Sequence, residues 1–212
     1  MMRRRNVKHA DERLDKCGDL MINNPEELKG NWDSAFPLNQ KIHLEIGMGK
    51  GKFILENAKR NPHINYLGLE KYNSVIVQAA EKIAPLDLPN IHLINKDANK
   101  LLEYFGEKEL DAIYLNFSDP WPKARHAKRR LTSKYFLDIY KKILKDTGFI
   151  AFKTDNFPLY EYSVESFKEN GYAIIEQSFD LHTEYTDIVT TEYEDRFLQK
   201  GNPIYYLKAI KE

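Results

Sequence analysis

The fold is decided by residues 41–52, which read KIHLEIGMGKGK. Apolar and polar residues alternate over residues 41–46, as in a β-strand, and glycines follow at positions 47, 49 and 51 before a segment with helical periodicity. A strand that enters a helix through glycines is typical of an open α/β sheet, in which ligands bind beyond the carboxyl ends of the strands. Candidate functional residues are therefore expected at strand ends.

The same pattern of strand and helix continues along the chain. Further strands are expected at residues 64–69, 91–95, 111–116 and 149–153, and helices at residues 52–60, 74–83, 100–105, 133–144 and 159–169. Two last extended segments, residues 172–180 and 203–210, have no helix expected between them and are expected to pair antiparallel. The sequence predicts an α/β fold with a mostly parallel seven-stranded sheet, helices on both faces and an antiparallel strand at the C-terminal edge.

Length and composition fit one main domain. The chain has 212 residues, and we expect an N-terminal polar and basic arm over residues 1–35 followed by one domain over residues 36–212. Residues 1–5 are basic, but no apolar run follows them, and no apolar run reaches the length that crosses a bilayer. One cysteine and six scattered histidines offer no metal-ligand spacing. We expect a cytoplasmic protein with neither a metal nor membrane association.

The charges are balanced overall and segregated locally. Lys and Arg number 32, as do Asp and Glu, yet residues 121–145 hold nine basic residues against Asp138 alone. Residues 176–196 hold seven acids against one arginine. The basic segment indicates binding to an anionic partner, whereas a solvated helix face is the ordinary alternative for such a run.

Acidic residues follow the expected ends of five strands: Glu45, Glu70, Asp97, Asp119 and Asp155. The dinucleotide-binding pattern would need a glycine at Lys52, and a carboxylate at Glu45 suits a pyrophosphate poorly. A cationic nucleoside such as S-adenosylmethionine suits these acids better. Glu70 would accept hydrogen bonds from the ribose hydroxyls, Asp97 would face the adenine, and Glu45 would face the cationic amino-acid end, with Gly47 and Gly49 allowing close approach. The alternative is that these acids are helix caps.

A stiff loop and a run of cations follow the fourth expected strand. Asp119 and Trp121 alternate with Pro120 and Pro122, so little conformational freedom remains to be lost on binding. The cations that follow are interpreted as a clamp for nucleic-acid phosphates. Trp121 is equally consistent with stacking on a base and with packing the loop. The residues expected to contact RNA are Arg125, His126, Lys128, Arg129 and Arg130.

The motifs SDPWPKARHAKRRL (residues 118–131), EIGMGKG (45–51), FKTDN (152–156) and TEYE (191–194) together carry a specific resemblance. They resemble the bacterial tRNA (guanine-N7-)-methyltransferase family, which belongs to the class I S-adenosylmethionine-dependent methyltransferases with a Rossmann-like fold. The resemblance covers residues from about 41 to 207. The N-terminal arm shares only its arginine-rich start with the family.

The resemblance implies a function and a set of residue roles. The enzyme would methylate N7 of guanine at position 46, in the variable loop of tRNA, giving 7-methylguanosine and S-adenosylhomocysteine. Glu45, Glu70, Asp97 and Asp119 would contact S-adenosylmethionine, with Asp119 also catalytic. The residues implied to hold the tRNA substrate are Lys123, Asp155, Thr191, Glu192, Tyr193 and Glu194. The expected partner is tRNA, with no obligate protein partner, and the sequence leaves monomer and homodimer open.

Three alternatives remain at this point. The enzyme would methylate another RNA if the resemblance fixed the reaction but not the substrate. A nicotinamide-dependent oxidoreductase uses the same kind of sheet, although Lys52 and Glu45 argue against it. A non-catalytic RNA-binding module would explain the basic run but not the acids at the strand ends.

Overall fold

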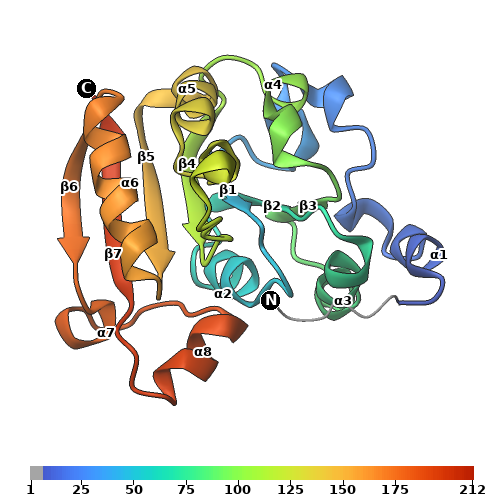
Figure 1. Cartoon of the computed structure of the whole chain (residues 1–212). Coiled ribbons are helices and arrows are strands. Elements are labelled where there is room, and N and C mark those ends of the chain that lie inside the picture. The colour runs from blue at the N-terminus through green and yellow to red at the C-terminus, as the bar shows by residue number, and fades with distance from the viewer. Residues whose placement is uncertain (1–6) are drawn as a thin grey trace. The chain divides into compact units, whose positions relative to one another are not determined.

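The structure is a computed structural model that describes residues 7–212, so the basic start at residues 1–5 lies outside the described residues. The chain divides into two compact units, Met1–Phe105 and Gly106–Glu212. Figure 1 shows the course of the chain through both units.

Three parallel strands form the centre of the first unit, in the order β3-β2-β1. Most of their buried residues are Ile, Leu and Tyr, as expected for parallel strands covered by helices, and His43, Glu45 and Asn65 are buried as well. In this unit the predicted strand and helix ends agree with the observed ones to within about two residues. In the second unit, the strand predicted at residues 149–153 begins earlier, at Leu144, because residues 145–148 include no apolar side chain that would indicate a strand. The elements are β1 (Lys41–Ile46), α2 (Lys52–Arg60), β2 (Ile64–Leu69), α3 (Asn73–Ile83), β3 (Ile91–Ile94) and α4 (Leu101–Tyr104).

Close packing at two glycines shapes this unit. Gly51 has φ +76° and precedes α2, and a Cβ at this position would lie 3.1 Å from Cβ of Ala79 on α3. A Cβ at Gly68, in the middle of β2, would collide with Sδ of Met48. Met48 lies between Gly47 and Gly49 and is buried, so the glycine loop is held by its own methionine packed over β2.

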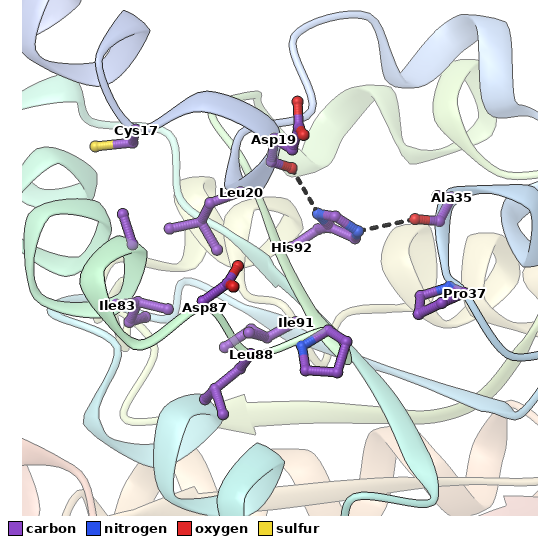
Figure 2. A pocket seen from close by; sticks show the side chains of 12 residues that line it. Cys17, Asp19, Leu20, Ala35, Pro37, Ile83, Asp87, Leu88, Ile91 and His92 are labelled. Carbon is purple, nitrogen blue, oxygen red and sulfur yellow. Dashed lines mark hydrogen bonds between the residues drawn. The ribbon is translucent and has the colours of Figure 1, made fainter.

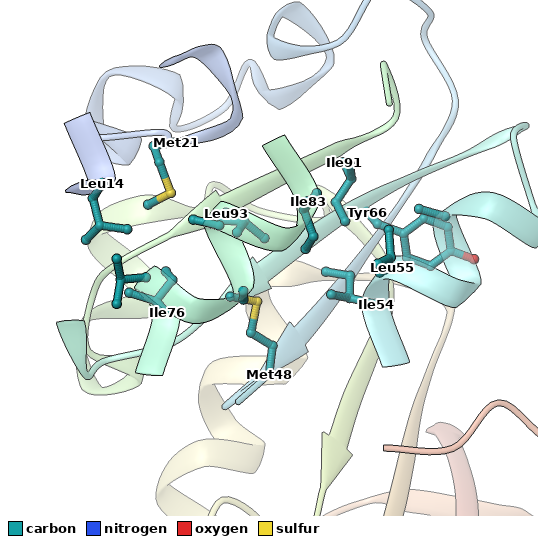
Figure 3. Packing of buried hydrophobic residues seen from close by; sticks show 14 residues of the cluster. Leu14, Met21, Met48, Ile54, Leu55, Tyr66, Ile76, Ile83, Ile91 and Leu93 are labelled. Carbon is teal, nitrogen blue, oxygen red and sulfur yellow. The ribbon is translucent and has the colours of Figure 1, made fainter. Parts of the chain in front are cut away.

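The segment before β1 is folded onto the first unit. Leu14 and Met21 pack into the same apolar cluster as Ile76 and Leu93 (Figure 3). Arg13 donates two hydrogen bonds to Glu81 on α3, at 2.7 and 2.6 Å. The predicted arm boundary at residue 35 stays a prediction. The elements of this segment are α1 (Ala10–Asp15) and the 3-10 turns η1 (Gly18–Leu20), η2 (Pro25–Leu28) and η3 (Trp32–Ala35).

Four strands form the centre of the second unit, in the order β4-β5-β7-β6. β4 and β5 are parallel, whereas β7 lies between β5 and β6 and is antiparallel to both. The predicted antiparallel pairing of the last two segments is confirmed. The elements are β4 (Leu110–Asn116), α5 (Lys134–Ile143), β5 (Leu144–Thr154), α6 (Phe157–Glu169), β6 (Tyr172–Ser178), α7 (Leu181–Glu184), α8 (Glu192–Leu198) and β7 (Tyr205–Lys211).

The prediction that no helix lies between the last two strands was wrong. The short helices α7 and α8 both occur there. α8 begins with a capping box, in which Thr191 Oγ1 accepts from the backbone N–H of Glu194 and the Glu194 carboxylate accepts from the N–H of Thr191. Such a pair satisfies two amides that a helix start leaves unbonded, which stabilises a helix too short to show apolar periodicity.

The predicted fold class is confirmed: the strands are mostly parallel, an antiparallel strand follows at the C-terminal end, and helices connect them. Residues 7–212 contain no helix that is both long enough and apolar enough to cross a membrane.

Candidate functional site

Glu70 directly follows β2 in the first unit and holds the glycine loop. Its buried carboxylate accepts hydrogen bonds from the backbone N–H of Gly49, at 3.2 Å, and of Tyr72, at 3.0 Å. These two bonds hold the Glu70 carboxylate directly beside the glycine loop.

Glu45 lies near the end of β1, directly before the glycine loop. Glu45 is the penultimate residue of β1, is 2% exposed, and pairs in register with Gly68 of β2. Gly47 and Gly49 have φ values of +75° and +59°, and a Cβ built on either would meet nothing within 4 Å. The loop therefore has space above its backbone, and the positive φ values explain why glycine stands at both positions.

Asp97 follows β3 by three residues and is tied to Lys71. The Lys71 ammonium donates to one carboxylate oxygen of Asp97, and the backbone and side chain of Asn99 donate to the other, at 2.9 and 2.7 Å. Partial burial raises the pKa of Asp97, but these donors outweigh it and hold the pKa below its usual value. Asp97 thus caps the turn Ala98–Lys100 and also bonds to Lys71, the residue that follows Glu70.

A pocket of about 330 Å³ lies elsewhere in the first unit and contains none of the predicted site residues (Figure 2). It is lined by the N-terminal segment and by residues around β3. Nδ1 of His92 lies 2.8 Å from the carbonyl of Asp19, and Nε2 lies 2.9 Å from the carbonyl of Ala35. His92 therefore joins the N-terminal segment to β3.

In the second unit, the loop after β4 is held by Arg130. The Arg130 guanidinium donates to the carbonyls of Pro120, at 3.0 Å, and Trp121, at 3.1 Å, and its Cζ lies 4.2 Å from the ring centre of Tyr162. Trp121 has φ +41°, which is unfavourable for a bulky side chain and is maintained by these contacts. The side chain of Asp119, in this loop, is exposed.

Most of the predicted RNA-contacting cations are exposed. The side chains of Lys123, Arg125, Lys128 and Arg129 are exposed, whereas His126 and Arg130 are half-buried. Arg129 lies over Trp121, 4.9 Å from the ring centre, and His126 contacts the edge of the same ring. The residues from 124 to 129 form a 3-10 helix, η6 (Ala124–Arg129), before α5.

Asp155 and Tyr193 are brought together from segments distant in sequence. The Tyr193 hydroxyl donates to Oδ2 of Asp155 at 3.2 Å, and its ring stacks on Phe197 with centres 4.3 Å apart. Partial burial and the Asp155 carboxylate raise the pKa of Tyr193 to about 12, so the hydroxyl remains protonated at neutral pH. Tyr193 is 42% exposed, which leaves this pair open to a ligand.

Glu194 is placed differently from its neighbours in the TEYE motif. Its side chain is fully buried, and its Oε1 lies 2.8 Å from Nε2 of His182 and 3.4 Å from Nζ of Lys153. A buried carboxylate bonded in this way supports the loop rather than contacting RNA. Lys153 and His182 were not among the predicted site residues. For their partner Glu194, the sequence signal is the T-x-x-E spacing of residues 191–194, which indicates a capping box.

Comparison with known proteins identifies the family. A family model described as "Putative methyltransferase" matches residues 39–207. The chain belongs to this methyltransferase family. The resemblance to the tRNA (guanine-N7-)-methyltransferases is thereby confirmed at the level of the family.

Solved structures with a similar fold are also methyltransferases. The 16S rRNA methyltransferase KamB superposes with a TM-score of 0.65 at 15% identity, over 82% of this chain and 89% of that one. A 30S ribosomal A1408 methyltransferase from an uncultured bacterium gives 0.58 at 17% identity, over 89% and 94%. Phosphoethanolamine N-methyltransferase 2 of Haemonchus contortus, solved with S-adenosyl-L-methionine, gives 0.54 at 14% identity, over 81% and 49%. At these identities the likeness establishes the fold.

The first unit has the chemistry that S-adenosylmethionine requires. Two buried carboxylates, Glu45 and Glu70, flank an open glycine loop, and Asp97 stands at the next strand end. Anionic side chains suit the sulfonium, the ammonium and the ribose hydroxyls of this methyl donor. The family and this set of residues describe a methyltransferase that depends on S-adenosylmethionine.

Proposed function

We propose that the enzyme methylates N7 of a guanine in tRNA, at position 46 of the variable loop, in the cytoplasm. The observation that carries the proposal is the loop after β4, in which the SDPWPK sequence is pinned by Arg130 and continues into exposed cations. A methyltransferase with a cationic surface directly after a stiff acidic loop is suited to a nucleic-acid substrate.

For the cofactor, we propose Glu45, Gly47, Gly49, Glu70, Asp97 and Asp119 as the binding residues. When bound, S-adenosylmethionine supplies an electrophilic methyl group. Glu70 is already oriented by the amides of Gly49 and Tyr72, so it accepts ribose hydroxyls without reorganisation. For Asp97 to receive the adenine edge, Lys71 has to share or leave its carboxylate.

The acceptor chemistry explains why acids rather than a general base are expected. N7 of guanine carries a lone pair and no proton at neutral pH, so the reaction needs alignment of N7 with the methyl group. As the bond forms, positive charge grows on the purine. A fixed carboxylate accelerates the step only to the extent that it stabilises this charge more than the ground state, and Asp119 is proposed for that role.

For the RNA, we propose separate tasks for the predicted residues. Lys123, Arg125, His126, Lys128 and Arg129 bind phosphates, and Arg130 shapes the loop. Asp155 and Glu192 accept from the N–H edge of guanine, while Thr191 and Tyr193 border it. Glu194 serves the substrate through the position of its neighbours, because it is fully buried.

Labelled S-adenosylmethionine and unmodified tRNA test the proposal directly. We expect label in tRNA and, after digestion, in 7-methylguanosine from position 46. A transcript with adenine at position 46 is the matched control and should remain unlabelled. Label in another nucleoside, or none in tRNA, would refute the proposed substrate.

A second candidate is methyl transfer to ribosomal RNA. It is favoured by the similarity of the fold to KamB and to the A1408 methyltransferase, which act on ribosomal RNA or the 30S subunit. The same assay with 30S subunits in place of tRNA separates the two, because only one substrate should be labelled to stoichiometry.

A further inference from the structure

A buried cluster of charged side chains joins three segments of the second unit. Lys153 comes from the end of β5, His182 from α7 and Glu194 from α8. The side chain of Glu194 has no exposed area, that of Lys153 is 7% exposed, and that of His182 is 21% exposed. Nε2 of His182 carries the proton of its 2.8 Å contact, because a carboxylate only accepts hydrogen bonds.

The cluster also holds the backbone that precedes α8. The Lys153 ammonium donates to the carbonyl of Val189 at 2.9 Å, and the Glu194 carboxylate accepts from the N–H of Thr191 at 3.1 Å. Lys153 and Glu194 thus bond to the two ends of the segment from Val189 to Thr191. The position of the Glu194 carboxylate therefore determines where α8 begins.

The exposed pair Asp155 and Tyr193 stands on the same two segments. Asp155 follows Lys153 by two residues, and Tyr193 directly precedes Glu194. Their hydrogen bond at 3.2 Å joins the residue directly after β5 to α8, on the exposed side. A shift of the buried pair would move the exposed pair, because the chain between them is too short to absorb it.

We infer that His182 is a positioning residue for the RNA substrate, acting through Glu194. The inference rests on the proposed function, in which Asp155, Glu192 and Tyr193 receive the guanine. Nε2 of His182 fixes one oxygen of Glu194 so that the other faces Thr191. Without that donor, the carboxylate rotates toward Lys153, the bond to Thr191 weakens, and the Asp155–Tyr193 pair samples several arrangements.

His182 is separable from the stability of the cluster. Lys153 remains beside Glu194 when the imidazole is removed, so the buried carboxylate keeps a counter-charge. The partial exposure of His182 also lets water replace part of the lost contact. The effect is therefore local to the segment that carries Thr191 and Tyr193.

Three variants test the inference: His182→Leu, which removes the donor; His182→Gln, whose amide restores an N–H; and His63→Leu, a control at an exposed histidine of the first unit. For His182→Leu we expect KM for tRNA to rise about tenfold, the factor of one charge-assisted hydrogen bond, with the affinity for S-adenosylmethionine unchanged. His182→Gln should recover most of the loss, and His63→Leu should behave as wild type. A wild-type KM in His182→Leu would overturn the inference.

Amide hydrogen exchange measured without RNA separates the inference from the proposed function. The amide of Thr191 should exchange faster in His182→Leu than in the wild type and in His182→Gln. An unchanged rate would overturn the positioning role even if tRNA is the substrate, whereas a wild-type enzyme inactive on tRNA would overturn only the proposed substrate. If His182→Leu does not fold, His182→Asn, whose shorter side chain places its donor away from Glu194, should show the same two changes.

Discussion

Glu70 in the first unit and Glu194 in the second are both buried carboxylates that tie a loop to the end of a strand. Glu70 is held by the backbone amides of Gly49 and Tyr72, whereas Glu194 is held by the cationic Lys153 together with His182 and Thr191. The difference separates two uses of the same residue type. Glu70 fixes the glycine loop, where a ligand is proposed to bind, whereas Glu194 pairs with a buried lysine inside the fold.

The largest effect expected from this comparison is on stability. Lys153→Met keeps the length of the side chain but leaves the buried Glu194 without its cation, which should lower the free energy of unfolding by about 3–5 kcal/mol. Urea denaturation measures the loss. Lys134→Met is the control, because Lys134 forms an exposed pair with Asp138 worth only about 0.3–0.5 kcal/mol. A loss equal to that of the control would show that Glu194 is not held as described.

Asp119 differs from both Glu70 and Glu194 because its side chain is not buried. Asp119 is exposed in the pinned loop, so its charge is available and its removal should not unfold the protein. Asp119→Asn should lower kcat about 10²–10³-fold, the range for a group that stabilises charge in a transition state. Binding of tRNA, measured by filter retention, should be nearly unchanged. Asp138→Asn is the control, and wild-type turnover by Asp119→Asn would remove it from the mechanism.

The comparison also shows what sequence reasoning reaches. The strands of the first unit and the acids near their ends were predicted because each βα repeat places its candidate site residue at the end of an apolar run, as Glu70 follows β2. The cluster around Glu194 was missed because His182 and Lys153 come to it from 12 and 41 residues away. A lone histidine and a lysine inside a strand have no pattern that indicates a common partner.

Glu194 shows a further limit of prediction from motifs. The resemblance places all of residues 191–194 at the substrate, but a helix turn of four residues points its side chains in different directions. Tyr193 is exposed and Glu194 is fully buried. The capping geometry of α8 determines which of residues 191–194 is exposed. Because this helix was not predicted from the sequence, Tyr193 could not be distinguished from Glu194.

Glu70→Gln tests whether the Glu70 carboxylate binds S-adenosylmethionine as well as holding the glycine loop. The amide keeps the size of the side chain but removes the charge, so binding of S-adenosylmethionine should weaken about 10–100-fold, equivalent to roughly 1.5–3 kcal/mol for a hydrogen bond to a charged group. Titration calorimetry measures the affinity, and Glu103→Gln, at an exposed pair in the same unit, is the control. If the affinity is unchanged, Glu70 serves only to hold the glycine loop, and the contrast with Glu194 disappears.

The smallest expected effect is on the salt dependence of tRNA binding, and it distinguishes the adjacent residues Arg129 and Arg130. Arg129 is exposed over Trp121, whereas Arg130 donates to the carbonyls of Pro120 and Trp121. Arg129→Ala should reduce the slope of log affinity for tRNA against log salt by up to about one unit, with kcat unchanged, because one phosphate contact is lost. Arg130→Ala should leave the slope nearly unchanged and lower kcat, because the loop that carries Asp119 loosens. Equal changes of slope in both variants would mean that Arg130 also binds phosphate, in addition to its hydrogen bonds to the loop carbonyls.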